Sequence, residues 1–518
     1  MKTNTLKLSA LVMLMAITGC TSKPTFNADI LLTGGLLISG DGSPVNAKQV
    51  AICEDKICGI FAPDSTHIKA KKIIDVSGKV IAPGFIDPHT HSLSDLKSST
   101  RNNNLNYLTQ GVTTVINGND GGGPVDFDAT KHTLHANGIG TNVGLLVGHG
   151  SLRKQVMGKV ARQATEKEMS QMEALLEAAM KQGALGLSSG LYYVPGSYAN
   201  TNEVVRLAKV AAKFNGIYDT HIRDESTFSI GLIPAVQEAI DIAKAADIHL
   251  HLAHIKALGV DVWGQSEQII KLVESEQQQG LSISADQYPW LASGTKLHSA
   301  LMPKWVMADS KKAFHARLKD PRLQDQIDRE LAENLRRRGG AKAILITKFH
   351  DKSLEGKTLE QVAKEWNLSA ISATKKLVLM GQVRIASFNM SAEDVENFMQ
   401  QTWVVTSSDG TDGHPRKYAS FPKKLKSYVL DKNLMSLETF IQRSSADTAK
   451  YFNIKKRGQI KPDYFADIIV FDPKQISVNA SFAHWNVLTE GMQYVFVNGE
   501  IVINDHKFTN IHAGKVID

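Results

Sequence analysis

The chain has 518 residues, of which 42% are hydrophobic and 21% are charged, and its formal net charge is +7. This length favours a large domain with a smaller one beside it over a single core. Lysines and arginines are scattered, without a basic stripe or interleaved aromatic residues, which argues against nucleic acid as a partner. The positive charge instead indicates a solvated surface suited to an anionic cell envelope.

The first nineteen residues have the pattern of a secretory signal. Two lysines precede an apolar stretch over 8–17, and Ile17-Thr-Gly-Cys20 places small residues before a cysteine. The segment 1–19 resembles a bacterial lipoprotein signal peptide, so we expect lipidation at Cys20 and a tether over 20–27. An ordinary cleaved signal or a short anchor helix is the alternative, although the apolar stretch is too short to span a bilayer.

Lipidation would make the membrane a partner of the chain through its anchor. Two or more acyl chains hold a protein stably on a membrane. Thr21, rather than an acidic residue, follows the cysteine, which in Gram-negative lipoproteins favours the outer membrane. We therefore expect an envelope protein that faces the periplasm.

The other two cysteines flank a predicted hairpin. Asp55-Lys56 is a plausible two-residue turn, and in that register Cys53 faces Cys58 directly as a non-hydrogen-bonded pair. A periplasmic location would permit a disulfide there, of little stabilising effect because the loop is tiny. Two free thiols are the alternative.

Beyond residue 80, strand-like runs alternate with helical runs, a pattern typical of parallel β/α architecture. Thr165-x-x-Glu168 is a capping box that begins one well-marked helix, and Gly183 ends it. We expect an α/β chain with a (β/α)8 TIM-like barrel over 84–455. Its eight strands, the number that a closed barrel needs, are predicted over 80–91, 111–119, 142–150, 184–190, 216–221, 249–254, 281–288 and 403–408.

Two further parts are expected outside the barrel. The stretch between the seventh and eighth strands exceeds an ordinary loop, so we assign residues 292–385 to an inserted lid. The segments 28–83 and 456–518 are rich in strand-like runs. We expect both ends of the chain to meet in one small β-sandwich.

Histidines and carboxylates stand at the ends of the predicted strands, where the chemistry of such barrels is located. His89 and His91 are two residues apart, so their side chains point the same way from an extended strand. Strand-end histidines can also be satisfied core groups, but so many together predict a metal site, and imidazole and carboxylate ligands suit Zn²⁺. The candidate ligands are His89, His91, Asp120, His221, His254 and Asp409.

Several motifs carry a resemblance to a known family. The segments 84–91, 183–198, 220–225, 254–256, 286–289 and 408–410 resemble the N-acyl-D-amino-acid deacylases, the D-aminoacylase branch of the amidohydrolase superfamily. The match runs from about residue 28 to the C-terminus. It implies a barrel that carries one or two zinc ions, a β-sandwich and a lid. It also implies hydrolysis of the amide of an N-acyl-D-amino acid, which releases a carboxylate and a free D-amino acid.

One position departs from the family. Where the family usually has a metal-binding cysteine, this chain has Asp120. A carboxylate can replace the thiolate and can bridge two ions, although it is a harder donor. The fourth strand ends in Ser188-Ser189 and offers no lysine, so Asp120 must be the bridge if two ions bind. The alternative is that Asp120 only caps the loop 120–123.

The resemblance also implies individual roles. Asp120, His221 and His254 would hold the principal ion, whereas His89, His91 and Asp409 would form the weaker side of the site. Asp409 is the candidate general base, which takes a proton from the attacking water and gives it to the leaving amine; the alternative is a ligand role only.

A second set of residues is expected to bind the substrate. Its members are Lys256, Tyr288, Arg416, Tyr192 and Ser189. The loop that precedes Arg416 is shorter than in the family, so a surface arginine is the alternative at that position.

Other functions are consistent with the same residues. One alternative is a dipeptidase for D-amino-acid-containing envelope peptides, and another is a cyclic-amide hydrolase. A third is a metal-free binding lipoprotein, which the intact ligand set disfavours.

Overall fold

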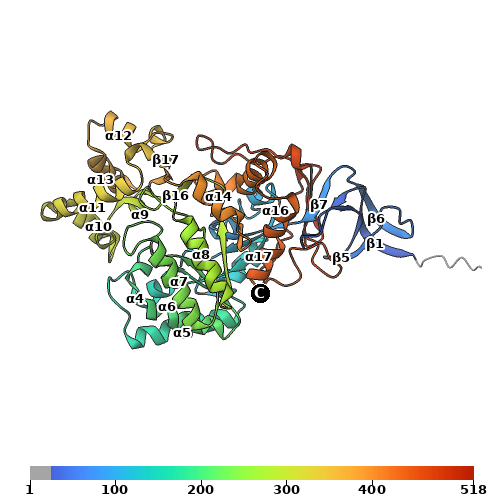
Figure 1. Cartoon of the computed structure of the whole chain (residues 1–518), viewed down its shortest axis with the longest axis horizontal. Coiled ribbons are helices and arrows are strands. Elements are labelled where there is room, and N and C mark those ends of the chain that lie inside the picture. The colour runs from blue at the N-terminus through green and yellow to red at the C-terminus, as the bar shows by residue number, and fades with distance from the viewer. Residues whose placement is uncertain (1–24, 518) are drawn as a thin grey trace, which may run out of the picture.

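The computed structural model describes residues 25–517, so the predicted signal peptide and Cys20 lie outside the described residues. A central barrel carries helices on its outside, and a β-sandwich and an inserted domain lie at opposite ends of the long axis (Figure 1). This arrangement confirms the predicted fold class. Among residues 25–517, no helix has both the length and the apolar character that crossing a membrane requires.

The sandwich consists of two sheets, built from both ends of the described chain. One sheet has the order β5-β4-β1-β6, with β1 at Phe26–Thr33, β4 at Gln49–Cys53, β5 at Lys56–Phe61 and β6 at Ile68–Asp75. The other has the order β23-β22-β21-β20-β7-β2-β3, with β2 at Leu36–Leu37, β3 at Asn46–Ala47, β7 at Val80–Pro83, β20 at Ile468–Phe471, β21 at Met492–Val497, β22 at Glu500–Asn504 and β23 at Lys507–Phe508. Alternate apolar residues of both sheets, such as Leu32, Ile52 and Ile468, form their shared core.

The barrel contains eight strand positions, and the third is interrupted at Leu146. In chain order the strands are β8 (Phe85–Thr90), β9 (Val112–Asn117), β10 (Asn142–Leu145) with β11 (Val147–Gly148), β12 (Gly186–Gly190), β13 (Ile217–His221), β14 (His249–Leu252), β15 (Ile283–Gln287) and β19 (Val404–Thr406). A parallel bridge from Thr90 to Gly410 and the hydrogen bond from the Asp409 amide to the His89 carbonyl connect the last strand to the first. The carboxyl ends of all eight strand positions therefore meet around one axis.

Amphipathic helices cover the outside of the barrel. They include α3 (Phe127–Asn137), α4 (His149–Met157), α5 (Glu166–Lys181), α6 (Thr201–Ala212), α7 (Leu232–Ala246), α8 (Ser266–Gln278), α14 (Ala392–Gln400), α16 (Leu437–Arg443) and α17 (Ala446–Tyr451). The predicted capping box of Thr165 and Glu168 is present at the start of α5. Met172 and Leu176 on α5 are fully buried and belong to the core that the helix shares with the barrel.

The inserted domain has a core of its own. Its three-stranded sheet has the order β16-β18-β17, formed by Ala292–Lys296, Arg384–Phe388 and Ile344–Lys348. The helices around this sheet are α9 (Leu297–Leu301), α10 (Lys311–Lys319), α11 (Gln324–Arg337), α12 (Leu359–Glu365) and α13 (Ala370–Met380). Because β16 follows the seventh barrel strand and β18 leads back to the eighth, the domain is held over the open end of the barrel.

Two predicted strands were wrong in their boundaries. The run 80–91 is not one strand: β7 belongs to the sandwich and β8 to the barrel, with Gly84 between them. A side chain at Gly84 would collide with Thr113, so the chain can cross between the sheets only with a glycine here. The third predicted strand ends at Gly148, because His149 begins α4.

The predicted hairpin register was also wrong. The turn is formed by Glu54-Asp55, and Cys53 pairs with Lys56 rather than with Cys58. Glu54 has φ of 52°, and its amide donates to the Asp29 carboxylate at 2.7 Å, which holds the turn one residue earlier than expected. A bulge in the ladder then brings Cys58 back toward Cys53, and the two form a disulfide with their Cα atoms 5.7 Å apart.

A buried ionic network joins the sandwich to the barrel. The Asp467 carboxylate accepts hydrogen bonds from Arg457, from the Asn142 side chain at 3.1 Å and from the Asn498 amide at 2.8 Å. Residues 514–517 also leave the sandwich and pair beside β10. The two domains therefore share charged contacts as well as backbone hydrogen bonds.

Replacing Asp467 with alanine is expected to lower the free energy of unfolding by about 3 kcal/mol, because it leaves the buried Arg457 without its partner. Urea unfolding followed by tryptophan fluorescence measures this loss. Asp463→Ala is the matched control, since Asp463 pairs with Lys456 on the surface. Equal stability of Asp467→Ala and the parent would show that the network does not hold the domains.

Candidate metal centre and substrate pocket

The predicted ligand residues converge at the carboxyl ends of the strands. His89 and His91 come from the end of β8, Asp120 follows β9, and His221 ends β13, with the remaining two after β14 and β19. The residues form two groups whose ligand atoms lie within 4.8 Å of one another. One group is His89, His91, Asp120 and Asp409, and the other is Asp120, His221 and His254.

Asp120 belongs to both groups and lies between them. One carboxylate oxygen, Oδ1, lies 3.4 Å from His89 Nε2 and 3.2 Å from His254 Nε2, whereas Oδ2 lies 3.4 Å from His91 Nε2. His221 Nδ1 is 3.6 Å from Oδ1. Asp120 is thus the one candidate ligand that the two groups share, a contact that capping of the loop 120–123 would not require.

The backbone is strained at three of these residues. Asp120, His254 and Asp409 have φ values of 56°, 36° and 44°, in the left-handed region that side chains disfavour. Such strain is stored where the surrounding structure fixes a functional geometry. Gly190 makes room for it, because a side chain there would lie 2.2 Å from the Asp120 carbonyl oxygen.

The cluster fits a divalent cation. His89 Nε2 and Asp120 Oδ1 are buried, and neither has a hydrogen-bond partner. Burial disfavours the imidazolium of His254, but the carboxylates of Asp120 and Glu225 outweigh burial and raise its pKa to about 9. A bound cation would take the place of that proton opposite Asp120. Imidazole and carboxylate ligands are those that Zn²⁺ prefers.

Carboxylates lie behind two of the histidines, but only the one behind His254 is within hydrogen-bonding distance, since His89 Nδ1 has no hydrogen-bond partner. His254 Nδ1 lies 3.2 Å from Glu225, and His89 Nδ1 lies 3.6 Å from Asp286. A carboxylate that accepts the proton of one ring nitrogen leaves the other nitrogen free to bind a metal. Neither Asp286 nor Glu225 was among the candidate site residues, although each stands in a segment that resembles the family.

A small compartment of about 30 Å³ lies beside the second histidine group, and its lining includes Lys256, Tyr288 and Arg416. Arg416 is 1% exposed, and its Nη2 lies 2.8 Å from the Asp409 carboxylate. Its Nε and Nη1 have no hydrogen-bond partner. Lys256 is paired with Glu225, whereas Arg416 and Arg338, whose Nη1 also has no partner, are cations of the lining with donors left for a ligand.

Arg416 is therefore not a surface residue, although the loop before it is short. Tyr192 lines the pocket and donates to the Ser299 carbonyl of the inserted domain at 3.1 Å. Ser189 does not lie at the edge of the site. Its hydroxyl is fully buried and bonded to Tyr218 and Thr220, because β12 turns this residue toward its neighbour strand β13.

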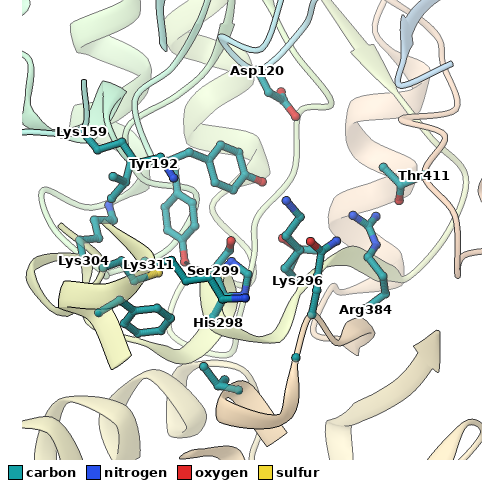
Figure 2. A pocket seen from close by; sticks show the side chains of 18 of the residues that line it. Asp120, Lys159, Tyr192, Lys296, His298, Ser299, Lys304, Lys311, Arg384 and Thr411 are labelled. Carbon is teal, nitrogen blue, oxygen red and sulfur yellow. Dashed lines mark hydrogen bonds between the residues drawn. The ribbon is translucent and has the colours of Figure 1, made fainter. Parts of the chain in front are cut away.

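A larger cavity of about 640 Å³ extends from the metal ligands to the inserted domain (Figure 2). His91, Asp120 and Asp409 line its barrel side, and residues of β16, α9, α10 and β18 line the opposite side. Tyr193 also faces the cavity, and burial raises its pKa well above the usual value. The site thus combines the candidate metal ligands, an inner compartment that contains cations, and an outer cavity that reaches the inserted domain.

Comparisons with known proteins agree with this geometry. A family model described as the amidohydrolase family matches residues 72–339, more than half of the chain, and another of the same description matches residues 299–502. The D-aminoacylase of Alcaligenes xylosoxydans xylosoxydans is 31% identical over 516 residues, which cover 94% of this chain and 97% of that relative.

Solved structures of the same branch share the whole fold. A D-aminoacylase described with a binuclear metal centre has a TM-score of 0.80 and 29% identity, over 95% of this chain and 100% of its own. An N-acyl-D-glutamate deacylase from Bordetella bronchiseptica, complexed with zinc and a phosphonate inhibitor, has a TM-score of 0.79 and 27% identity, over 95% and 99% of the two chains. The chain belongs to the amidohydrolase family and, within it, to the D-aminoacylase branch.

Proposed function

We propose that this chain is a zinc-dependent N-acyl-D-amino-acid deacylase that binds one or two ions per subunit. The observation that carries the proposal is the position of Asp120 between two histidine groups, next to a compartment that contains the buried Arg416. The two solved relatives are described with a binuclear metal centre and with zinc, and all three relatives are named as deacylases or aminoacylases of D-amino acids.

In the proposal, the bound ion and the residues around it have different roles in the hydrolysis. A bound ion supplies Lewis acidity to the amide carbonyl and lowers the pKa of water. In the proposal Asp409 accepts a proton from the attacking water, and its position on the cavity wall beside His91, with Oδ1 3.1 Å from His91 Nε2, supports this role. Water oxygen bonds to the carbonyl carbon, the carbon–nitrogen bond breaks, and Asp409 passes the proton to the leaving nitrogen.

Asp409 is ionised in this environment. Burial alone would raise its pKa, but the Arg416 guanidinium and the hydrogen bond to His91 hold the pKa below the usual range of a carboxyl. Arg416 also faces the inner compartment, where Lys256 and Tyr288 are its neighbours. In the proposal these three groups bind the α-carboxylate of the substrate and fix its α-carbon next to the scissile amide.

In the proposal, the preference for D-amino acids follows from the places where three parts of the substrate bind. The carboxylate lies in the inner compartment, the carbonyl at the metal cluster and the side chain toward the outer cavity. Exchanging hydrogen and side chain at the α-carbon would direct the side chain against Tyr192 and Tyr193 or draw the carboxylate away from Arg416. A hydrolysis screen of paired N-acetyl-D- and N-acetyl-L-amino acids with zinc-loaded enzyme tests the proposal, and equal rates for both enantiomers would refute it.

The comparisons do not favour the alternative functions. None of the three relatives is named as a dipeptidase or a cyclic-amide hydrolase. The intact set of ligands also disfavours a binding protein without metal. Dipeptides and hydantoins in the same screen serve as the comparison substrates.

We further propose that the chain is a lipoprotein of the outer membrane, anchored through Cys20 and facing the periplasm. The support is the sequence of residues 1–21, with its apolar stretch, its small residues before the cysteine and Thr21 after it. The Cys53–Cys58 disulfide is compatible with an oxidising compartment.

Cys20→Ser is expected to move the protein from the membrane fraction to the soluble periplasmic fraction, because the lipid attachment is lost. Fractionation followed by immunoblotting measures the shift. Cys58→Ser controls for the loss of a cysteine and should leave the protein on the membrane. Tight membrane association of Cys20→Ser would contradict the lipid anchor.

A further inference from the structure

The outer cavity is strongly cationic. Its lining contains four lysines and one arginine, whereas its only acidic residues are the metal-cluster members Asp120 and Asp409. Figure 2 shows these cations on both sides of the space in front of Asp120. The cations are Lys159, Lys296, Lys304, Lys311 and Arg384.

Two of these cations face each other across a strand pair. Lys296 on β16 is directly opposite Arg384 on β18 in the antiparallel register. Like charges opposite each other destabilise a sheet. Burial, together with the charge of Arg384, lowers the pKa of Lys296. Holding these two cations opposite each other therefore costs electrostatic free energy. An anion bound between them would offset that cost.

No carboxylate of the described residues is in ion-pair contact with these cations, although Asp409 and Asp412 lie close enough to Arg384 to act on its charge. Within residues 25–517, none of the five cations forms an ion pair with an acidic side chain, and Arg384 Nε donates to the Asp412 carbonyl oxygen at 3.2 Å. Lys304 lies over the Tyr192 ring, 4.4 Å from its centroid, and burial lowers its pKa to about 8. Other lysines in the inserted domain do have partners, such as Lys375 with Asp328.

The inner compartment already provides for the α-carboxylate. Arg416 has two unpartnered nitrogens there, and this compartment does not include Lys296 or Arg384. An N-acyl-D-amino acid whose only charge is its α-carboxylate would thus leave the outer cations without an anionic partner. A substrate with a second anionic group would place that group among them, where charge-assisted hydrogen bonds are strong.

We infer that the physiological substrate is an N-acyl-D-amino acid that carries a second anionic group, bound in the outer cavity by Lys296 and Arg384. This inference rests on the proposed deacylase function and specifies its substrate class. The second charge comes either from an acidic D-side chain or from the acyl group, since both project from the scissile amide into open space. The lysines farther out give the cavity the positive potential that attracts such a substrate.

The test compares substrates of equal shape that differ in one charge. The first arm uses N-acetyl-D-glutamate against N-acetyl-D-glutamine, and the second uses N-succinyl-D-alanine against its succinamoyl analogue. We expect kcat/KM to be at least about tenfold higher for the anion in one arm, the effect of one lost charge-assisted hydrogen bond. The arm that shows the preference identifies the part of the substrate that carries the charge.

Variants connect the preference to the named residues. Arg384→Gln is expected to lower the ratio of anionic to neutral kcat/KM by about tenfold. Lys312→Gln is the matched control, because Lys312 lies on α10 next to Lys311 but is exposed and outside the cavity; it should leave the ratio unchanged. The preference should also fall as NaCl concentration rises, since salt screens exposed charges.

Several outcomes separate this inference from the proposed function. Equal or faster hydrolysis of the neutral analogue in both arms would overturn the inference and leave the deacylase function standing. Absence of hydrolysis for all four compounds would refute the deacylase function. Calorimetry with the Asp409→Asn protein decides the inference even then, because tighter binding of one anion over its neutral analogue supports it and equal binding overturns it.

Discussion

Asp409→Asn is expected to lower kcat by about 100-fold or more, because an amide keeps the shape of the side chain but cannot accept a proton. Zinc content should stay close to that of the parent, since His89, His91 and Asp120 remain in the same group. Steady-state hydrolysis of an N-acetyl-D-amino acid and metal analysis of the same sample measure both quantities. A large loss of turnover with metal retained separates the general base from a ligand.

The control is the same chemical change three residues along the loop. Asp412 binds Lys348 at 2.7 Å and Lys417 at 2.6 Å, and it does not line the cavity. Asp412→Asn should therefore reduce kcat far less than Asp409→Asn. If both variants lose turnover equally, the loss reflects the loop and not proton transfer. Parent-like turnover of Asp409→Asn would show that another group takes the proton.

Asp120→Ala is expected to abolish activity and tight zinc binding at the group that Asp120 forms with His221 and His254. The change removes the one ligand that the two histidine groups share, so the second group keeps only His221 and His254, and two imidazoles are fewer ligands than zinc sites in proteins use. Metal analysis after dialysis and kcat/KM after readdition of zinc measure the effect. Circular dichroism of the variant shows whether the barrel itself remains folded.

Two comparisons make this result specific. Asp120→Cys should keep measurable activity, because a thiolate is also a zinc ligand. Asp128→Ala removes an exposed carboxylate of α3 nearby in the sequence and should bind zinc like the parent. An Asp120→Ala protein that binds zinc and turns over like the parent would show that Asp120 is not the bridge.

Local sequence patterns predicted those structural features whose physical cause lies within one segment of the chain. The alternation of side chains along a strand placed His89 and His91 on one face, and the capping box predicted the start of α5. The repeated strand-to-helix pattern predicted the barrel, because parallel strands need covered crossovers. In such a barrel all carboxyl ends meet, so residues more than 300 positions apart could be expected in one cluster.

Features that depend on residues distant in the sequence could not be predicted from local patterns. The turn at Glu54 depends on the hydrogen bond that its amide donates to Asp29, and the step between β7 and β8 depends on Thr113 against Gly84. Ser189 follows the same strand-end rule as the ligands, yet its hydroxyl is taken up by Tyr218 and Thr220 from β13. The sequence of one strand does not show which side chains of the neighbouring strand will form hydrogen bonds with its polar groups.

The sequence by itself determined the fold class, the candidate metal ligands and the family, because periodicity and motif spacing are local properties. Only the tertiary structure decided that Asp120 lies between the two histidine groups, that Arg416 is buried against Asp409, and that Lys296 faces Arg384 in the outer cavity. These features depend on contacts between segments that meet only when the barrel closes and the inserted domain folds over it. Burial and charge at such meeting points depend on every element packed there, which no single stretch of sequence contains.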